Sequence, residues 1–244
     1  MSLSPNDRNI KVWNIKNWEC IFNHNINKDG SLRASCFLNQ NSIIYIVSSH
    51  YQCYNDNSIK IFDLNGNKIK VINNSDEDTY FIETYLEEKN SKIYIITANH
   101  GYSKSYDFNE NKLYHKYIGN DHRGHHSIII NNNNIVGIVN LIETSEDGKI
   151  RIWDFHSGDL LKIISVYNKW IHGICLWNND LLFIGNISRK IILVELKTGK
   201  IIKEYSGHNN LVLTLKKIIH PKYGDCLVSQ ARLNDKIIIW KNKN

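Results

Sequence analysis

An apolar or aromatic residue closes a short alternating segment at regular intervals along this chain, with a drifting period in the forties. The clearest copy is residues 149–153, where polar and β-branched apolar residues alternate as in a half-buried strand. The tight-turn signal Glu146-Asp147-Gly148 precedes it, and a second turn at 154–158 leads into another strand-like run at 160–166. The repeated positions, spaced by 49, 44, 47, 41 and 46 residues, are Trp13, Phe62, Tyr106, Trp153, Val194 and Trp240.

This spacing predicts an all-β fold, because a period in the forties with four short strands per unit is typical of the blades of a β-propeller. Residues 10–13 and 18–22 are predicted as the third and fourth strands of a first blade. Four complete antiparallel blades are predicted at 32–72, 80–118, 127–166 and 171–205, and three further strands between 211 and 240. In the blade at 127–166, residues 135–139 and 141–142 compete for the second strand.

The repeat resembles the WD-repeat family over essentially the whole chain. The residues that carry the resemblance are Trp153-Asp154, Trp13, Phe62-Asp63, Trp240, Gly124-His125 and Gly207-His208. The resemblance is specific for the fold and says almost nothing about function.

We predict a single propeller domain over residues 1–244 that begins in the middle of a blade, with about five to six blades present. Members of the family usually have seven. The sequence leaves four arrangements open: the C-terminal part of a longer propeller, a ring that a partner completes, a six-bladed ring and a compact five-bladed ring.

The resemblance also implies a buried hydrogen-bond chain of His, Ser or Thr, Asp and Trp in each blade, which stiffens the blade when it is complete. In one blade the matching residues are His125, Asp147 and Trp153, with Glu143 where Ser or Thr belongs. In the last blade they are His208, Ser229 and Trp240, with Asn234 or Asp235 as the acid. Because these positions recur from blade to blade, we interpret them as structural and predict no catalytic residues.

A propeller presents binding residues on the loops that lead into the first strand of each blade, since these loops line the mouth of the channel. Trp170 is the expected anchor, because tryptophan often dominates the energy of an interface; packing between blades is the alternative. The residues predicted to surround it are His172, Tyr80, Arg33 and Leu211.

The densest group of titratable residues is the run His122-Arg123-Gly124-His125-His126. Three histidines in five residues could hold a metal ion. However, the resemblance already assigns His125 a structural role, and Asp121 is the only carboxylate nearby. We therefore predict a basic loop without metal or cofactor, and keep an enzyme using this run as an alternative.

Charge and cysteine content indicate which classes of partner and which cellular compartment to expect. The net charge of +6 is spread over the chain and every arginine is isolated, which argues against a nucleic-acid face. The five cysteines have no CxxC spacing and are interpreted as reduced thiols, most of them small core residues, in a cytoplasmic or nuclear protein. No apolar run approaches the ~18 residues of a membrane span, and the first residues do not form a signal peptide.

The sequence thus predicts a non-catalytic scaffold that binds proteins or peptides at the propeller mouth, with small molecules, membranes and nucleic acids not expected as partners. The alternative is a substrate-receptor propeller of a ubiquitin ligase or kinase assembly whose effector domain lies outside this chain.

Overall fold

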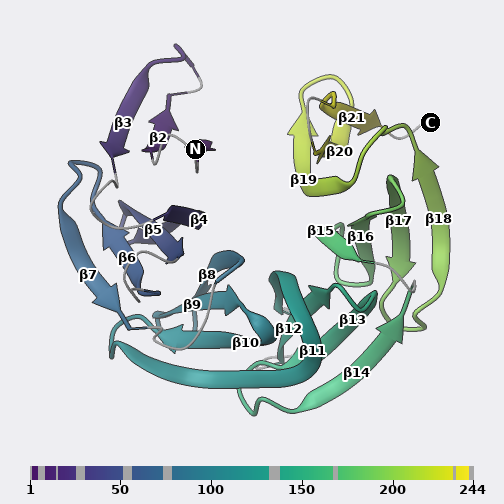
Figure 1. Ribbon diagram of the computed structural model, residues 1–244, viewed down its shortest axis with the longest axis horizontal. Helices are drawn as coiled ribbons and strands as arrows, with labels where there is room; N and C mark the ends of the chain where they lie inside the picture. Colours follow the sequence, from purple (N-terminus) through teal and green to yellow (C-terminus); the bar gives the residue numbers. More distant parts are fainter. Residues whose placement is uncertain are drawn as a thin grey trace. The chain divides into compact units, whose positions relative to one another are not determined.

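The computed structural model describes residues 2–4, 9–14, 16–25, 31–51, 57–73, 79–131, 138–166, 170–232 and 235–241, with backbone alone for 2–4, 31–32, 50–51, 120–122 and 125. Within these residues the chain is made of β-strands and turns, without helix (Figure 1). No helical segment of the described part could therefore cross a membrane. The prediction of an all-β fold with four-stranded antiparallel sheets of the propeller-blade type is confirmed.

Contacts divide the chain into two compact units, Met1–Lys116 and Tyr117–Asn244. The prediction of one domain over residues 1–244 stays a prediction. In the first unit, a three-stranded sheet contains β1 (Ser2–Ser4), β2 (Asn9–Trp13) and β3 (Cys20–Asn25). A four-stranded sheet follows with β4 (Ser31–Gln40), β5 (Ile43–Tyr51), β6 (Ile59–Phe62) and β7 (Lys68–Ile72), and then β8 (Phe81–Glu87), β9 (Lys92–Ala98) and β10 (His100–Asp107).

The strand β11 (Lys112–Asn131) crosses the boundary between the units. In the second unit it pairs with β12 (Val139–Ser145), which is followed by β13 (Lys149–Asp154) and β14 (Leu160–Ser165). A four-stranded sheet contains β15 (Ile171–Leu176), β16 (Leu181–Asn186), β17 (Lys190–Glu195) and β18 (Ile201–Ser206), which lie side by side in chain order in Figure 1. The last sheet has three strands, β19 (Val212–His220), β20 (Gly224–Ala231) and β21 (Ile238–Lys241).

Three details differ from the sequence prediction. No strand was expected before residue 10, yet β1 pairs with β2 through Leu3 and Ile10; three residues are too few to show an alternating pattern. Residues 113–118 and 127–130 were expected as separate strands but belong to the single strand β11, because the polar run between them stays extended. The strand β12 contains Leu141 and Ile142, so these residues form the second strand of that blade; residues 132–137 lie outside the described part.

The repeat in the sequence coincides with a repeat in strand register. The pairing of the third with the fourth strand shifts at Trp13, Phe62, Trp153 and Val194. A shift of this kind marks a β-bulge, which increases the local twist of the strand. The positions aligned by sequence are therefore equivalent in the backbone, including Val194, where the aromatic side chain is missing.

The predicted turns on either side of β13 have the backbone conformation that glycine favours. Gly148 has φ of +74° and its N–H donates to the carbonyl of Ser145 (3.2 Å). Gly158 has φ of +77° and donates to the carbonyl of Asp154 (3.0 Å). These left-handed residues reverse the chain without the strain that a Cβ would bring.

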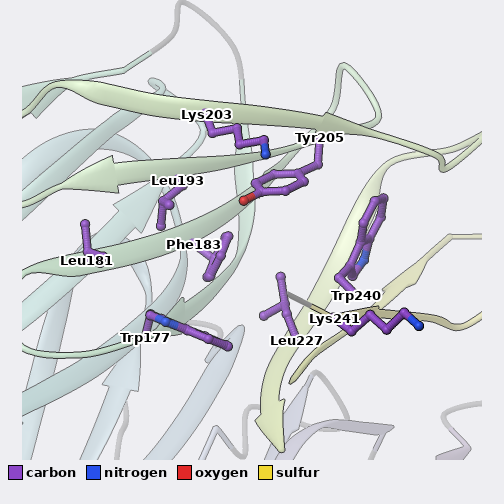
Figure 2. Close-up of a pocket in the computed structure, with 9 residues that line it drawn as sticks. All are labelled: Trp177, Leu181, Phe183, Leu193, Lys203, Tyr205, Leu227, Trp240 and Lys241. Atoms are coloured by element: carbon purple, nitrogen blue, oxygen red, sulfur yellow. The ribbon is translucent and has the colours of Figure 1, made fainter. Parts of the chain in front are cut away.

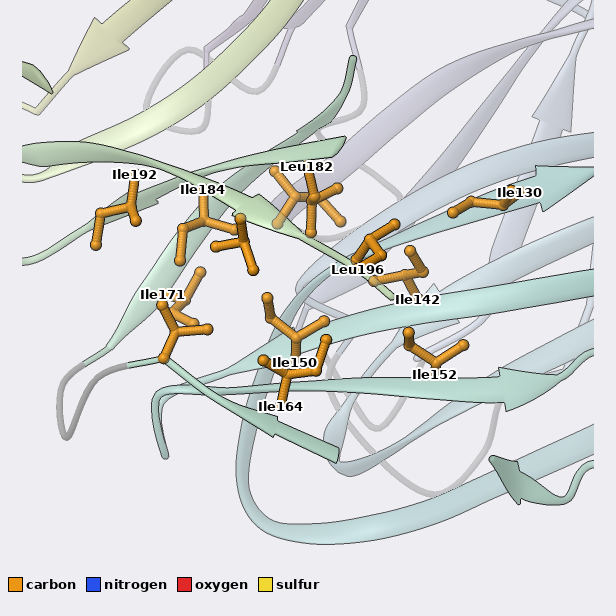
Figure 3. Packing of buried hydrophobic residues seen from close by; sticks show 13 residues of the cluster. Ile130, Ile142, Ile150, Ile152, Ile164, Ile171, Leu182, Ile184, Ile192 and Leu196 are labelled. Atoms are coloured by element: carbon orange, nitrogen blue, oxygen red, sulfur yellow. The ribbon is translucent and has the colours of Figure 1, made fainter. Parts of the chain in front are cut away.

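Neighbouring sheets within each unit pack through isoleucine-rich faces. In the second unit, the sheet of β12–β14 packs against the sheet of β15–β18 through a cluster that includes Ile142, Ile150, Ile184 and Ile192 (Figure 3). In the first unit, a similar cluster joins β4–β7 to β8–β10 through residues such as Val47 and Ile95. Burial alternates along β2, but β9 and β13 are buried along almost their whole length. The half-buried strand predicted at 149–153 is therefore covered on both faces, because successive residues of a strand point to opposite faces and all but the end residues of β13 are buried.

A lysine at one repeated position of the fourth strand ties each of two sheets to its neighbour. Lys70 and Lys162 both pair with the residue that precedes the repeated position, Ile61 and Ile152 respectively. The ammonium group of Lys70 donates to the carbonyl of Phe108 in the first unit. That of Lys162 donates to the carbonyls of Leu196 (3.0 Å) and Lys197 (2.5 Å) in the second.

Four cysteines lie in the described part, and all four are free thiols. Cys175 and Cys226 are buried and Cys36 is partly buried, as expected for small core residues. Cys20 was expected to be similar but is exposed, because it begins β3 on the solvent-facing side of that strand. Cys53 lies outside the described residues.

Candidate functional site

The five residues predicted to bind a partner fall into both units. Arg33 and Tyr80 belong to the first unit, where the guanidinium of Arg33 lies 5.2 Å from the centre of the Tyr80 ring. Trp170, His172 and Leu211 belong to the second unit. The structure thus brings together a pair in one unit and a cluster in the other, and we consider each by itself.

Two of the predicted binding residues lie at β-bulges, which set the direction of their side chains. Arg33 is the extra residue of a bulge between Leu32 and Ala34, and His172 is the extra residue between Ile171 and Gly173. A bulge turns the side chain of the extra residue away from the regular alternation of the strand. The sequence motif alone does not mark these bulges, because the signal lies in the pairing with the second strand.

The backbone around His172 is held by a close approach of the last sheet. A Cβ on Gly173 would lie 2.9 Å from the carbonyl oxygen of Leu213, and one on Gly185 would lie 2.8 Å from that of Val212. Glycine is therefore required in β15 and β16 so that β19 can pack directly against them. This packing fixes the position of the bulge.

Trp170 stands at the start of β15 with its indole ring partly in solvent. Its side chain is 44% exposed and meets the ring of His172 edge to face, with 6.0 Å between ring centres and 64° between planes. The carbonyl of Trp170 accepts a hydrogen bond from the N–H of Ile187 (3.1 Å). A large ring on a held backbone loses little conformational entropy when a partner covers it.

Leu211 is buried, so its side chain does not form part of an exposed surface. Its carbonyl instead accepts a hydrogen bond from the N–H of Arg232 (2.9 Å), which fixes the backbone at an exposed arginine just after β20. The sequence prediction did not include Arg232, because it compared only the residues at the start of the first strand of each blade. Arg232 follows the end of the second strand of the last blade, β20. Comparing the ends of second strands would have found it.

Two histidines in this region are held neutral. Burial lowers the pKa of His172 to about 4, with a contribution from the charge of Arg232. Burial likewise lowers the pKa of His126 to about 3, with contributions from His172 and Lys216. Near neutral pH both imidazoles are uncharged, and the formal positive charge lies on the exposed residues Arg232 and Lys216.

We call the surface formed by Trp170, His172, His126, Lys216 and Arg232 the Trp170 cluster. It combines an exposed indole, two neutral imidazoles and two cations on strands of packed sheets. This composition suits a protein or peptide with an apolar or aromatic anchor and an acidic neighbour.

In the last sheet the residues of the implied hydrogen-bond chain lie together. The indole N–H of Trp240 donates to Oγ of Ser229 (2.7 Å), and Nε2 of His208 lies 2.6 Å from the same oxygen. Nδ1 of His208 lies 3.1 Å from Oδ2 of Asp235, which also accepts from the N–H of Asn209 (2.8 Å). Asp235 therefore takes the acidic position; Asn234 lies outside the described residues.

The sheet of β12–β14 has a different arrangement. Asp147 forms an ion pair with Arg151 (2.5 Å from Nη2 to Oδ2) and accepts a hydrogen bond from Ser145. Burial alone would raise the pKa of Asp147, but these hydrogen bonds and the charge of Arg151 hold the pKa below its usual value. Nε1 of the buried Trp153 has no hydrogen-bond partner among the described residues.

The sequence suggested that Gly124-His125 and Gly207-His208 occupy equivalent positions in their sheets, but the strand register shows that they do not. Gly124 pairs with the last residue of β12, as Val212 does with that of β20, so Gly124 corresponds to Val212 and not to Gly207. The glycine under the ring of Trp153 is Gly119, where a Cβ would lie 2.7 Å from Cη2; under Trp240 it is Gly207, at 2.9 Å. The side chain of His125 lies outside the described part, so its role stays a prediction.

A cavity of about 570 Å³ lies between the sheets of β15–β18 and β19–β21 (Figure 2). Four aromatic residues follow one another along its wall, with 5.4 to 5.9 Å between successive ring centres: Trp177, Phe183, Tyr205 and Trp240. The remaining lining residues are three leucines and two lysines, Leu181, Leu193, Leu227, Lys203 and Lys241. No sequence signal pointed to this cavity, because its wall is assembled from five strands and from Trp177, which follows a sixth strand, β15.

No group of three His, Cys, Asp or Glu side chains that could hold a metal ion occurs in the described part of the chain. The side chains of His122 and His125 are outside that part, so the alternative of a metal site at 122–126 stays open.

Comparison with known proteins gives one informative similarity. A segment of 70 residues is 33% identical to the U3 small nucleolar RNA-associated protein 21 homolog of Schizosaccharomyces pombe. The segment covers 29% of this chain and 8% of that protein. No protein-family model matches the chain. The similarity and the antiparallel sheets are consistent with the WD-repeat family that the sequence resembles.

Proposed function

We propose that this chain is a non-catalytic scaffold that binds a protein or peptide through the Trp170 cluster. The observation that supports this most directly is the half-exposed indole of Trp170, set against the partly buried, neutral His172 on a backbone held by inter-sheet packing. An exposed aromatic ring on a rigid scaffold is the usual anchor of a protein interface.

The mechanism is rigid presentation. The strands β11, β15 and β19, together with the ends of β15 and β20, hold the residues of the cluster before a partner arrives, so binding costs little ordering entropy. Lys216 and Arg232 give the surface a positive rim that favours an acidic partner and speeds its association.

We also propose a nuclear location. The support is the relative whose name associates it with a small nucleolar RNA, together with the predicted reduced thiols. The cytoplasmic option of the sequence prediction has no support from this relative.

The test is an affinity purification from native cells with the wild type, Trp170→Ala and Trp18→Ala. Trp18 is the matched control, because its side chain is 75% exposed and lies in the other unit. All three proteins should first show the same thermal unfolding. We expect a discrete set of partners to lose at least about tenfold in recovery with Trp170→Ala only; equal recovery with all three proteins would exclude the Trp170 cluster as the interface.

A further inference from the structure

The aromatic cavity between β15–β18 and β19–β21 lies away from the Trp170 cluster. Trp170 precedes β15 and Trp177 follows it, so the two tryptophans are separated by the length of a six-residue strand, roughly 20 Å. A ligand of the cavity would therefore be distinct from the partner proposed above.

The lining of the cavity is apolar with a positive edge. Its wall of aromatic and leucine side chains is joined by Lys203 and Lys241, and no carboxylate lines it. Lys203 lies 5.2 Å from the centre of the Tyr205 ring, and Lys241 lies 4.4 Å from that of Tyr223. The described residues provide neither lysine with an ion-pair partner. A third cation nearby, Lys217, is already paired with Asp225 (2.7 Å).

Lys203 occupies the repeated lysine position of the fourth strand. It pairs with Leu193, the residue before Val194, just as Lys162 pairs with the residue before Trp153 and Lys70 with the residue before Phe62. In those sheets the ammonium group crosses to backbone oxygens of the neighbouring segment. The equivalent ammonium group of Lys203 is thus placed at the cavity where an oxygen ligand can accept from it (Figure 2).

The geometry points to a protein segment with an apolar side chain flanked by carboxylates as the occupant of this cavity. A cavity of about 570 Å³ accommodates one or two large apolar side chains, whose burial would provide most of the affinity. The lysines would select acidic flanking residues by charge complementarity. Single-stranded nucleic acid fits less well, because the aromatic rings meet each other at steep angles of 56° to 87° and present no open stacking platform.

The test measures binding to the full chain by fluorescence anisotropy with short labelled peptides. The first peptide has glutamates and aspartates around a central Leu-Phe pair; the second replaces the acids by lysines, and the third replaces Leu-Phe by Ala-Ala. A uridine oligonucleotide is the fourth probe. We expect the first peptide to bind at least about tenfold more tightly than each of the other peptides.

The variants locate the site. Lys203→Glu combined with Lys241→Glu should weaken binding of the first peptide about tenfold or more, and 1 M salt should reduce the difference between acidic and basic peptides. Lys197→Glu is the matched control on an exposed lysine outside the cavity, and it should leave binding unchanged. Trp170→Ala should also leave it unchanged, which separates this site from the proposed function.

Three results would overturn the inference: absence of binding by the first peptide, equal binding of acidic and basic peptides, or loss of binding with Trp170→Ala but not with the lysine variants. Preferential binding of the oligonucleotide that is lost in the lysine variants would assign the cavity to nucleic acid instead.

Discussion

The sheets β12–β14 and β19–β21 place a tryptophan at the same repeated position but anchor it in different ways. In the last sheet, the indole N–H of Trp240 enters a hydrogen-bond chain through Ser229 and His208 to Asp235. In the earlier sheet, Glu143 occupies the register position that Ser229 has in the last sheet. Asp147, in the turn before β13, forms an ion pair with Arg151 on that strand.

The difference shows that two sheets can hold a tryptophan at the same repeated position with different polar networks. Both rings lie against a glycine, Gly119 or Gly207, with no room for a Cβ. The turn before the third strand is then held either by a hydrogen-bond chain across strands or by an ion pair between the turn residue Asp147 and Arg151 of β13. Three predictions test this comparison.

The largest effect is expected for the ion pair. Asp147→Ala should destabilise the protein by about 3–5 kcal/mol, because it removes the carboxylate that is paired with the buried guanidinium group of Arg151. Unfolding in urea, followed by tryptophan fluorescence, measures the loss. The control Asp180→Ala changes an exposed aspartate of the same unit and should have an effect within about 0.5 kcal/mol. Similar losses for the two variants would contradict the role of the ion pair.

A smaller effect is expected in the last sheet. Ser229→Ala removes the acceptor for Trp240 and the partner of His208, which should cost about 2–3 kcal/mol. Thr144→Val is the matched control in the earlier sheet, because Oγ1 of the buried Thr144 has no partner among the described residues. It should be neutral or slightly stabilising in the same urea experiment. A costly Thr144→Val would show a partner for that hydroxyl group.

The smallest effect concerns the pH dependence of stability, which should come from the two neutral histidines and not from the polar networks of the two sheets. The pKa values of His172 (about 4) and His126 (about 3) lie below the usual ~6.5, so the unfolded chain binds more protons below pH ~6.5. Stability should therefore be full above that pH and fall as the pH drops toward 4. We expect a loss of roughly 1–2 kcal/mol from His172, allowing for its partial exposure.

The comparison of wild type with His172→Gln tests this assignment. The variant cannot be protonated, so its loss of stability between pH 6.5 and 4 should be smaller than that of the wild type. The lowered pKa of Asp147 stabilises the folded protein above its ordinary pKa of 3.8, and this stabilisation is lost only as the pH falls below that value. An identical pH dependence for the two proteins would show that His172 is not the group that titrates.

Much of the fold was predictable because strand period and turn chemistry are local. The third strand 149–153, its flanking turns and the equivalence of Val194 with the aromatic positions all follow from the printed sequence, and the strand register agrees with them. The binding residues were harder to place. Trp170 and His172 do lie together, but Leu211 is buried, and Arg232 and His126 join them from strands that no local pattern connects.

The sequence by itself determined that this chain forms short antiparallel strands in repeated sheets, because alternation and turn-forming residues act over a few neighbours. Only the tertiary structure decided which residue each bulge turns outward, which glycine lies under each tryptophan, and where the lysine-edged aromatic cavity opens. These features depend on strand register and on the packing of one sheet against the next, which bring together residues distant in the chain.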